Sequence, residues 1–335
     1  MKEQGQRKTL VKLLRWFISL LISALAIWLV LRQVELSQFV DNLSKISLGT
    51  FFLASLVFLL SYLFRVYCWL VLLKKKTTYK NAFFAMGVGY LLNNVLPFRL
   101  GEFGRAILLG NKTELSTLEV LSSVLVERIF DIFLAAIFML SMLPRIVDTE
   151  FDQGFVFIMV ALSLGVLVIL FLAARFRGAI NQWLLARGER SPFIKNRVAP
   201  RGMQILDGLS ILTNPKYFAL AFGSLTISWL IAFGQNLISF RSLSPQAPFW
   251  WMIFTLSAGA FGNALPSAPA GIGVFEGVMV AAFAVLGVDP EIAFTQAVVV
   301  HFISFFYTSI FGLIGLHLQG EAFVSLYDKV MNRAT

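Results

Sequence analysis

Side chains that build metal and redox sites are scarce in this sequence. It contains a single cysteine, Cys68, and two histidines, His301 and His317. One cysteine cannot form a disulfide within the chain, and these three residues make no cluster with the spacing of metal ligands. A phosphate-binding loop, a dinucleotide-binding glycine motif and a G-x-S-x-G nucleophile motif are also missing. The sequence therefore predicts no cofactor, no metal and no catalytic residues, and it favours a protein that is not an enzyme.

Charged residues are scarce as well. They make up 14% of the chain, whereas hydrophobic residues make up 58%. A soluble globular protein has about 25% charged and roughly 45–50% apolar residues. The apolar excess lies in long runs that do not alternate with polar residues, which excludes a transmembrane barrel. Such runs suit helices that cross about 30 Å of hydrocarbon, so we expect residues 1–335 to form a single all-α integral membrane domain.

Six apolar runs are long enough to span a membrane. They cover approximately residues 13–34, 48–73, 118–143, 154–174, 217–240 and 291–318. In the first run, the segment from Ala24 to Ala26 resembles a signal-peptidase site. The apolar run nevertheless continues through Leu31, which favours an uncleaved first helix.

Two weaker apolar regions, 82–110 and 249–287, are interrupted by glycine and proline. Non-helical backbone at membrane depth must be buried in protein or face water. We therefore expect two re-entrant broken-helix hairpins beside a cavity. The alternative is a pair of ordinary loops outside the membrane, which the apolar flanks and the small number of charges disfavour.

Basic residues gather in alternate loops. The net charge is +10, and Lys and Arg dominate the amino terminus, loop 74–80 and the long loop 175–216. Because positively charged loops stay inside, we expect a protein of the cytoplasmic membrane with both termini cytoplasmic and segment 144–153 external. Nucleic acid is a poor partner, since the basic residues adjoin apolar runs. Loop 175–216 most simply controls topology, although it also suits binding of anionic lipid or a protein partner.

The two interrupted regions resemble each other. Segment 89–97 reads GYLLNNVLP and segment 259–266 reads GAFGNALP, so an asparagine lies three residues before a proline in both. By loop charge, the first region starts and ends inside, and the second starts and ends outside. Matching broken segments in two halves indicate a transporter binding site. We therefore expect inverted pseudo-repeats at roughly 48–143 and 217–318.

Charges cluster near the first break and in the apolar run that follows it. The six residues are Arg99, Glu102, Arg105, Glu127, Arg128 and Asp131. A lone charge at the bilayer centre costs roughly 2.5–3.5 kcal/mol, so these groups must pair or reach water. A Glu102–Arg105 pair is feasible on one helix. Arg65, late in the second run, is expected to extend to the cytoplasmic interface.

Arginines in such a cluster are suited to bind a lipid phosphate, because guanidinium is its natural two-pronged partner. Neighbouring carboxylates would hold the arginines or carry protons. The alternative is a set of structural salt bridges that lock the bundle, and His301 alone favours a structural role. The predicted substrate-contacting residues are Arg99, Glu102, Arg105, Glu127, Arg128, Asp131 and, on the far wall of one shared cavity, Glu276. The predicted cavity-shaping residues are Asn94, Pro97, Gly101, Asn263, Pro266, Pro269, Gly271 and Gly273.

Three motifs in the same order resemble a known family. They are residues 94–105 (NVLPFRLGEFGR), 127–131 (ERIFD) and 269–277 (PAGIGVFEG). The chain resembles, over nearly its whole length, the transmembrane domain family of lysylphosphatidylglycerol synthases, the flippase-like half of the bacterial multiple peptide resistance factor. The resemblance implies a bacterial or archaeal membrane protein with a lipid-translocating fold. The soluble aminoacyl-transferase domain of full-length relatives is expected to be absent, since only about fifteen residues follow the last apolar run.

The sequence thus predicts a flippase that moves a phospholipid or a lipid-linked anionic headgroup. One alternative is a non-transporting partner or scaffold of a lipid or glycan biosynthesis complex. The other is an enzyme acting on a lipid, for which the chain offers no nucleophile–base pair. Expected partners are membrane lipids, with a homo-oligomer or a membrane enzyme as further possibilities.

Overall fold

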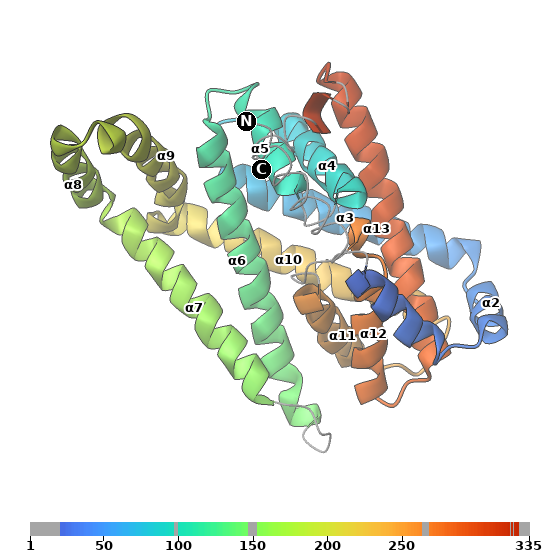
Figure 1. Cartoon of the computed structure of the whole chain (residues 1–335). Coiled ribbons are helices and arrows are strands. Elements are labelled where there is room, and N and C mark those ends of the chain that lie inside the picture. The colour runs from blue at the N-terminus through green and yellow to red at the C-terminus, as the bar shows by residue number, and fades with distance from the viewer. Residues whose placement is uncertain are drawn as a thin grey trace.

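All secondary-structure elements in the described part of the protein are helices (Figure 1). A computed structural model describes residues 21–96, 100–146, 153–262, 268–321, 323 and 325–327. The predicted all-α class is confirmed within these ranges.

Five long helices coincide with five of the predicted apolar runs. They are α3 (Leu48–Leu72), α6 (Thr117–Met142), α7 (Gln153–Arg175), α10 (Pro215–Phe240) and α13 (Pro290–Leu318). Local signals set where they begin: the Ser47 hydroxyl caps α3 by accepting from the Thr50 N–H, and Asn214 caps α10 ahead of Pro215. Serine and asparagine satisfy free N–H groups at a helix start, and proline fits the first turn.

Three helices, α3, α10 and α13, are long and apolar enough to cross a membrane. The number rises to five if each of two bent pairs is one span: Leu21–Leu31 with α2 (Leu36–Ser44), bent by 83°, and Val160–Arg175 with Arg177–Glu189, bent by 68°. Helix α6 has the length, but Glu127, Arg128 and Asp131 interrupt its apolar surface. The membrane class is confirmed, and the count of six spans stays a prediction.

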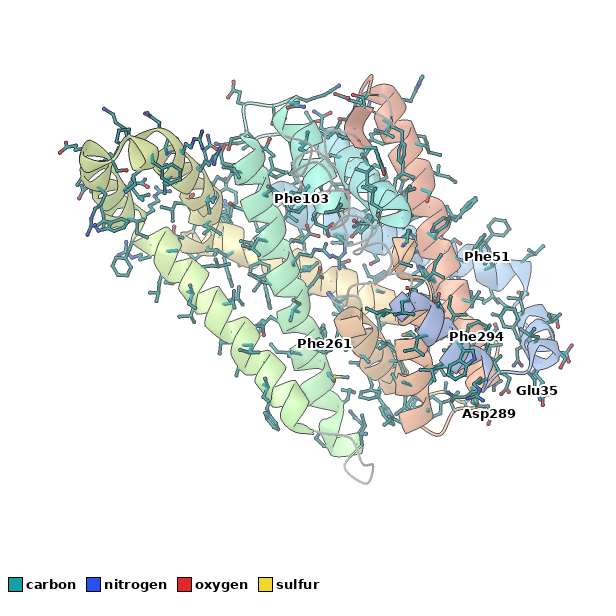
Figure 2. All side chains as sticks on the ribbon, in the orientation of Figure 1. Glu35, Phe51, Phe103, Phe261, Asp289 and Phe294 are labelled. Carbon is teal, nitrogen blue, oxygen red and sulfur yellow. The ribbon has the colours of Figure 1, made fainter. Side chains whose placement is uncertain are left out.

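Side chains on the outer helices suit a lipid environment (Figure 2). Leu162 and Ile169 of α7 are 58% and 64% exposed. A contiguous apolar surface of this kind is unusual in a soluble monomer. At the other side of the molecule α2 packs against α13, where the rings of Phe39 and Phe294 lie 5.3 Å apart.

The basic loop 175–216 is itself largely helical. It contains α8 (Arg177–Arg190), the π-helix η3 (Ile194–Val198), α9 (Ala199–Leu209) and the short 3-10 helix η4 (Ser210–Thr213). In Figure 1, α8 and α9 lie at the end of α7, beside the main bundle. Its assignment to the cytoplasm stays a prediction.

Each interrupted region forms two helices joined at the break. The first gives α4 (Tyr79–Val95) and α5 (Gly101–Gly110). The second gives α11 (Phe249–Gly262), the 3-10 turn η5 (Pro269–Gly271) and α12 (Val274–Val285). In both pairs the two helices pack against each other. Return to the same membrane face stays a prediction, and Pro97, Arg99, Asn263 and Pro266 lie outside the described residues.

The two halves of the chain pack reciprocally. Helix α3 packs along α10, α4 packs along α13, and α11 packs along α6. Each broken pair thus lies against the long last helix of the other half. At the α3–α10 contact, the Ser61 hydroxyl donates to the carbonyl of Ser228 and the Ser228 hydroxyl donates to the carbonyl of Ser61, both at 2.9 Å. Two related halves would make such a pattern, while the repeat boundaries stay a prediction.

Candidate functional site

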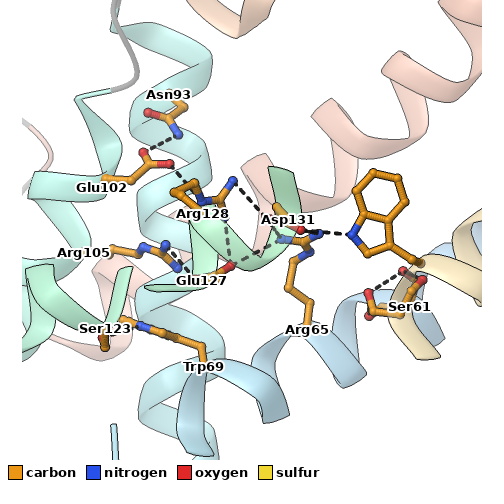
Figure 3. A network of polar contacts seen from close by, with 12 residues as sticks. Ser61, Arg65, Trp69, Asn93, Glu102, Arg105, Ser123, Glu127, Arg128 and Asp131 are labelled. Atoms are coloured by element: carbon orange, nitrogen blue, oxygen red, sulfur yellow. Dashed lines mark hydrogen bonds and ion pairs between the residues drawn. The ribbon is translucent and has the colours of Figure 1, made fainter. Parts of the chain in front are cut away.

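Glu127 lies at the centre of a buried charge network between α3, α5 and α6 (Figure 3). Its carboxylate accepts from Arg105 Nη2 at 2.8 Å and from Arg128 Nη2 at 2.8 Å, and Arg65 Nη1 lies at 3.3 Å. The Glu127 side chain has no solvent exposure. A buried charge is tolerated when it is paired and hydrogen-bonded. Here a single carboxylate is the shared partner of three guanidinium groups.

Asp131, one helical turn further along α6, binds Arg65 through two parallel contacts. Arg65 Nη1 reaches Asp131 Oδ2 at 2.8 Å, and Nη2 reaches Oδ1 at 2.8 Å. Trp229 Nε1 of α10 also donates to Oδ1 at 3.1 Å, and Arg128 Nη1 lies 3.5 Å from Oδ2. Residues four apart share one helix face, so α6 directs both carboxylates at α3. The two-pronged geometry is the strong form of an arginine–carboxylate pair.

Arg105 is held from its other side by an aromatic ring. Its guanidinium carbon lies 4.6 Å from the ring centroid of Trp69, and the Trp69 Nε1 donates to Ser123 Oγ at 3.1 Å. A guanidinium over an indole face gains a cation–π attraction. Trp69 follows Arg65 by four residues on α3, so one face of α3 contributes both a cation and an aromatic support. Only 4% of the Arg105 side chain is exposed.

The break between α4 and α5 is tied to the network through Asn93. The Asn93 Oδ1 accepts from the Gly101 N–H at 2.8 Å, and the Asn93 Nδ2 donates to Glu102 Oε2 at 3.0 Å. A Cβ at Gly101 would lie 1.9 Å from the carbonyl oxygen of Gly89. Only glycine therefore allows this approach of the two backbones. Glu102 is thereby aimed at Arg128, whose Nε lies 3.9 Å away.

The network is balanced in formal charge but not fully saturated. Among the residues that the structure describes, three arginines face three carboxylates: Arg65, Arg105 and Arg128 against Glu102, Glu127 and Asp131. Arg128 is the most accessible of the arginines, with 29% of its side chain exposed against 19% for Arg65. Its Nε is buried and has no hydrogen-bond partner in the described part of the chain.

A second polar cluster lies in the other half of the chain. Glu276, in the first turn of α12, contacts His301 Nδ1 of α13 through Oε1 at 2.5 Å and accepts from the Gly273 N–H through Oε2 at 2.7 Å. His301 Nε2 faces the carbonyl of Ala270 at 3.1 Å. Gly271 and Gly273 have φ values of +82° and +86°, which glycine adopts without strain.

The model of the family described as the lysylphosphatidylglycerol synthase TM region matches residues 16–312. The chain belongs to this family. It is also similar to a UPF0104 membrane protein of Methanocaldococcus jannaschii, with 24% identity over 231 residues that cover 68% of this chain and 93% of the relative. No solved structure matches the chain significantly.

Membership of the lysylphosphatidylglycerol synthase TM family confirms the resemblance carried by the three motifs. All three motifs contribute to the clusters described above. Glu102 and Arg105 come from the first motif, Glu127, Arg128 and Asp131 from the second, and Glu276 from the third. The family match indicates a membrane domain.

Five of the predicted substrate-contacting residues meet in one network: Glu102, Arg105, Glu127, Arg128 and Asp131. Glu276 pairs with His301 instead, and no ion pair or hydrogen bond found among the described residues joins the two clusters. A cavity shared by both stays a prediction. Asn94 ties α4 to α13, since its Nδ2 donates to Ser309 Oγ at 2.9 Å.

Two sequence-based expectations about pairing were wrong. Arg65 does not extend to the interface, because Asp131 holds it inside the bundle. Glu102 pairs with Arg128 and Asn93 rather than with Arg105, because α5 turns Arg105 toward Glu127. Sequence reasoning also missed Asn93, Trp69 and Trp229 as supports. The signal for Trp69 was present: it lies one turn after an arginine in an apolar run.

Within the described ranges, no group of three histidine, cysteine or acidic side chains could hold a metal ion. The carboxylates of the first cluster are occupied by guanidinium groups. The arrangement can instead bind an anion, exchange carboxylate partners for a phosphate, or hold protons.

Proposed function

We propose that this protein moves a lipid with an anionic headgroup, a phospholipid or a lipid-linked phosphate, across the cytoplasmic membrane. The observation that carries the proposal is the buried cluster of Arg65, Arg105 and Arg128 on helices that are otherwise apolar. Ionisable groups at membrane depth are costly and mark substrate or ion pathways. Guanidinium is the side chain best matched to a phosphate.

Arg128 is the first ligand in this proposal, because it is the most exposed arginine of the cluster. Arg99, outside the described residues, would join it from the break after α4. Arg105 is nearly buried and stacked on Trp69, so in this conformation it positions Glu127. When a phosphate binds Arg128, Glu102 and Asp131 would yield their contacts, which are the long ones at 3.9 and 3.5 Å.

The broken helix pairs support transport rather than simple anchoring. Discontinuous helices in two halves, packed reciprocally, are the architecture of secondary transporters. In this proposal α4–α5 opens from the cytoplasm and α11–α12 from the exterior, with both termini cytoplasmic. A phosphate would pass from one broken pair to the other while the acyl chains stay in lipid. Membrane lipids are then the partners, and catalysis is not required.

The test uses purified protein in vesicles that contain a fluorescent phosphatidylglycerol. Dithionite destroys only the fluorophores in the outer leaflet, so the rate of the second bleaching phase reports movement between leaflets. We expect wild-type vesicles to move phosphatidylglycerol faster than protein-free vesicles, and the Arg128→Ala variant to lose most of that rate. Arg128→Lys should keep part of it, because charge remains while the two-pronged geometry is lost.

The matched control is Arg201→Ala, on the exposed face of α9 and outside the charge network. It should move lipid at the wild-type rate. A wild-type protein that moves no lipid in either direction would favour a scaffold. Equal movement of phosphatidylglycerol by wild type and Arg128→Ala, with both folded, would remove the role of the arginine cluster.

A further inference from the structure

His301 has both ring nitrogens directed at oxygen atoms. Nε2 faces the carbonyl oxygen of Ala270 at 3.1 Å, and Nδ1 faces Glu276 Oε1 at 2.5 Å. A carbonyl oxygen only accepts hydrogen bonds, so Nε2 carries a hydrogen. If His301 is neutral, Nδ1 is then a bare acceptor.

A bare Nδ1 cannot face an ionised carboxylate without repulsion, because both atoms would offer lone pairs. One proton must therefore lie in the Nδ1–Oε1 contact. It belongs either to an imidazolium beside a carboxylate or to a carboxylic acid beside a neutral imidazole. In both forms the pair has no net charge. Loss of the proton leaves one uncompensated negative charge, with His301 and Glu276 side chains only 17% and 11% exposed.

No other charged group contacts this pair among the described residues. Helix α11 and the helix Leu21–Leu31 contain no titratable side chain, and α12 contains only Glu276. Phe275 covers the imidazole, with ring centroids 5.0 Å apart. The remaining titratable residues on α13 and on the helices packed against α13 and η5 are Asp41, Tyr62, Arg65, Tyr67, Cys68, Tyr79, Lys80, Tyr90, Lys216, Tyr217, Glu291, Tyr307 and His317. Of these, Arg65 is held by Asp131 and Glu291 by the Glu35 N–H.

The pair also holds a turn in place. Ala270, whose carbonyl faces His301, has φ +62°, a left-handed conformation that is unfavourable for a non-glycine residue. On the other side, the Ala268 N–H donates to Ser23 Oγ at 2.9 Å, and a Cβ at Gly273 would lie 2.6 Å from the Ser23 carbonyl. The turn 268–273 is thus clamped between α13 and the helix Leu21–Leu31.

We propose that Glu276 and His301 form a proton-binding latch that closes the turn 268–273 onto α13. Proton uptake closes the latch, because the shared proton joins Nδ1 to Oε1. Proton release opens it, because the lone pairs of Nδ1 and Oε1 then repel each other and the ionised carboxylate is more stable in contact with water. This role rests on the proposed lipid movement. The protonation state of Glu276 and His301 then controls whether the second broken pair, α11–α12, opens.

The test measures how accessible Val274, buried at the start of α12, becomes when the latch opens. A Val274→Cys variant in a Cys68→Ser background is labelled with an uncharged maleimide in detergent. Ile272→Cys is the matched control, because Ile272 is 47% exposed with the latch closed. Dividing the two rates removes the intrinsic pH dependence of thiols. We expect the normalised rate to rise roughly tenfold between about pH 5.5 and about pH 8.5, as proton release opens the latch.

Two variants separate the shared proton from packing. Glu276→Gln keeps a latch without a titrating proton, because its amide N–H can donate to Nδ1 while its oxygen accepts from Gly273. It should stay protected across the whole pH range. His301→Leu should be labelled fast at every pH. A pH-independent normalised rate in the wild type, or a wild-type response in Glu276→Gln, overturns the latch.

The labelling needs no lipid movement, so it fails independently of the proposed function. A pH-dependent rate in a protein that moves no phosphatidylglycerol supports the latch and removes the flippase. Lipid movement by wild type together with a flat labelling profile removes the latch and keeps the flippase.

Discussion

At the residue scale, Glu127 pairs with three arginines, of which only Arg128 is its neighbour in the sequence. One fully buried carboxylate contacts arginines from α3, α5 and its own helix. Removing one partner of a buried pair is far more costly than removing an exposed pair, since the remaining charge is left unpaired in a medium of low polarity. Glu127 therefore couples the stability of the bundle to the geometry of the proposed phosphate site.

We predict that Glu127→Gln lowers the free energy of unfolding by about 3–5 kcal/mol. Thermal unfolding in detergent, followed by circular dichroism, would measure it. Glu119→Gln on the same helix is the matched control, because Glu119 pairs at 3.6 Å with Lys76, whose side chain is 49% exposed. It should cost about 0–1 kcal/mol. Equal unfolding curves for the two variants would contradict the central role of Glu127.

Arg65 and Asp131 should be energetically coupled. We predict that Arg65→Met together with Asp131→Leu destabilises the protein less than the sum of the single variants, by roughly 0.5–3 kcal/mol, because the double variant leaves fewer unpaired charges. A double-mutant cycle on unfolding free energies measures this. Arg65→Met combined with Glu119→Gln should instead be additive within about 0.5 kcal/mol. Additivity of the first pair would show that the two-pronged contact stabilises nothing.

At the element scale, the helix breaks bring backbones unusually close together. Helices α4 and α5 approach so closely at Gly101 that no side chain fits, and Asn93 bridges the gap with two hydrogen bonds. Helix α4 also meets α13 through glycine: a Cβ at Gly312 would lie 2.4 Å from Leu91 Cβ. Small residues at helix contacts are typical of membrane bundles, where packing replaces the hydrophobic effect.

We predict that Gly101→Ala destabilises the protein by about 1–3 kcal/mol or more, because the added methyl must displace the Gly89 carbonyl. Gly165→Ala in α7 is the matched control, since a Cβ there meets nothing within 4 Å. It should leave stability unchanged or raise it by roughly 0.5–1 kcal/mol. Detergent melting temperatures compare the two. A Gly101→Ala variant that melts with the control would mean that α4 and α5 can separate freely.

At the scale of the whole molecule, reciprocal packing of the two halves brings distant segments together. Each broken pair lies against the last long helix of the other half. The charge network draws on α3, α5, α6 and α10, and the histidine cluster on α12, α13 and the turn 268–273 that precedes α12. The charge network therefore spans both halves of the chain, whereas the histidine cluster lies within the second half.

Orientation in the membrane follows from loop charge and can be checked by labelling. We predict that a cysteine at Arg187, on α8, reacts only after the membrane is opened, and that a cysteine at Pro144 reacts with a membrane-impermeant maleimide in intact cells. Cys68→Ser supplies the background, and Cys68 is buried in any case. Reaction at position 187 in intact cells would reverse the assignment of the basic helices to the cytoplasm.

Much of the fold follows from the sequence alone. The long helices begin and end within a few residues of the apolar runs, and both breaks fall in the glycine- and proline-rich regions. These features are local: an apolar helix satisfies its own backbone hydrogen bonds in lipid, and proline and glycine interrupt it wherever it lies. The charged motifs, and through them the family, were recognisable for the same reason.

Only the tertiary structure decided which charges meet. Helical spacing shows that Glu127 and Asp131 share a face, but it does not show that this face meets Arg65 of α3, so the sequence alone predicts that Arg65 extends to the membrane interface. It likewise does not reveal that His301 lies between Glu276 and Ala270, whose positions in the chain are 25 and 31 residues away. From the sequence alone, several acceptors are equally plausible hydrogen-bond partners for a given arginine or histidine. The rotation and close packing of whole helices select among them, and those depend on contacts between residues far apart in the chain.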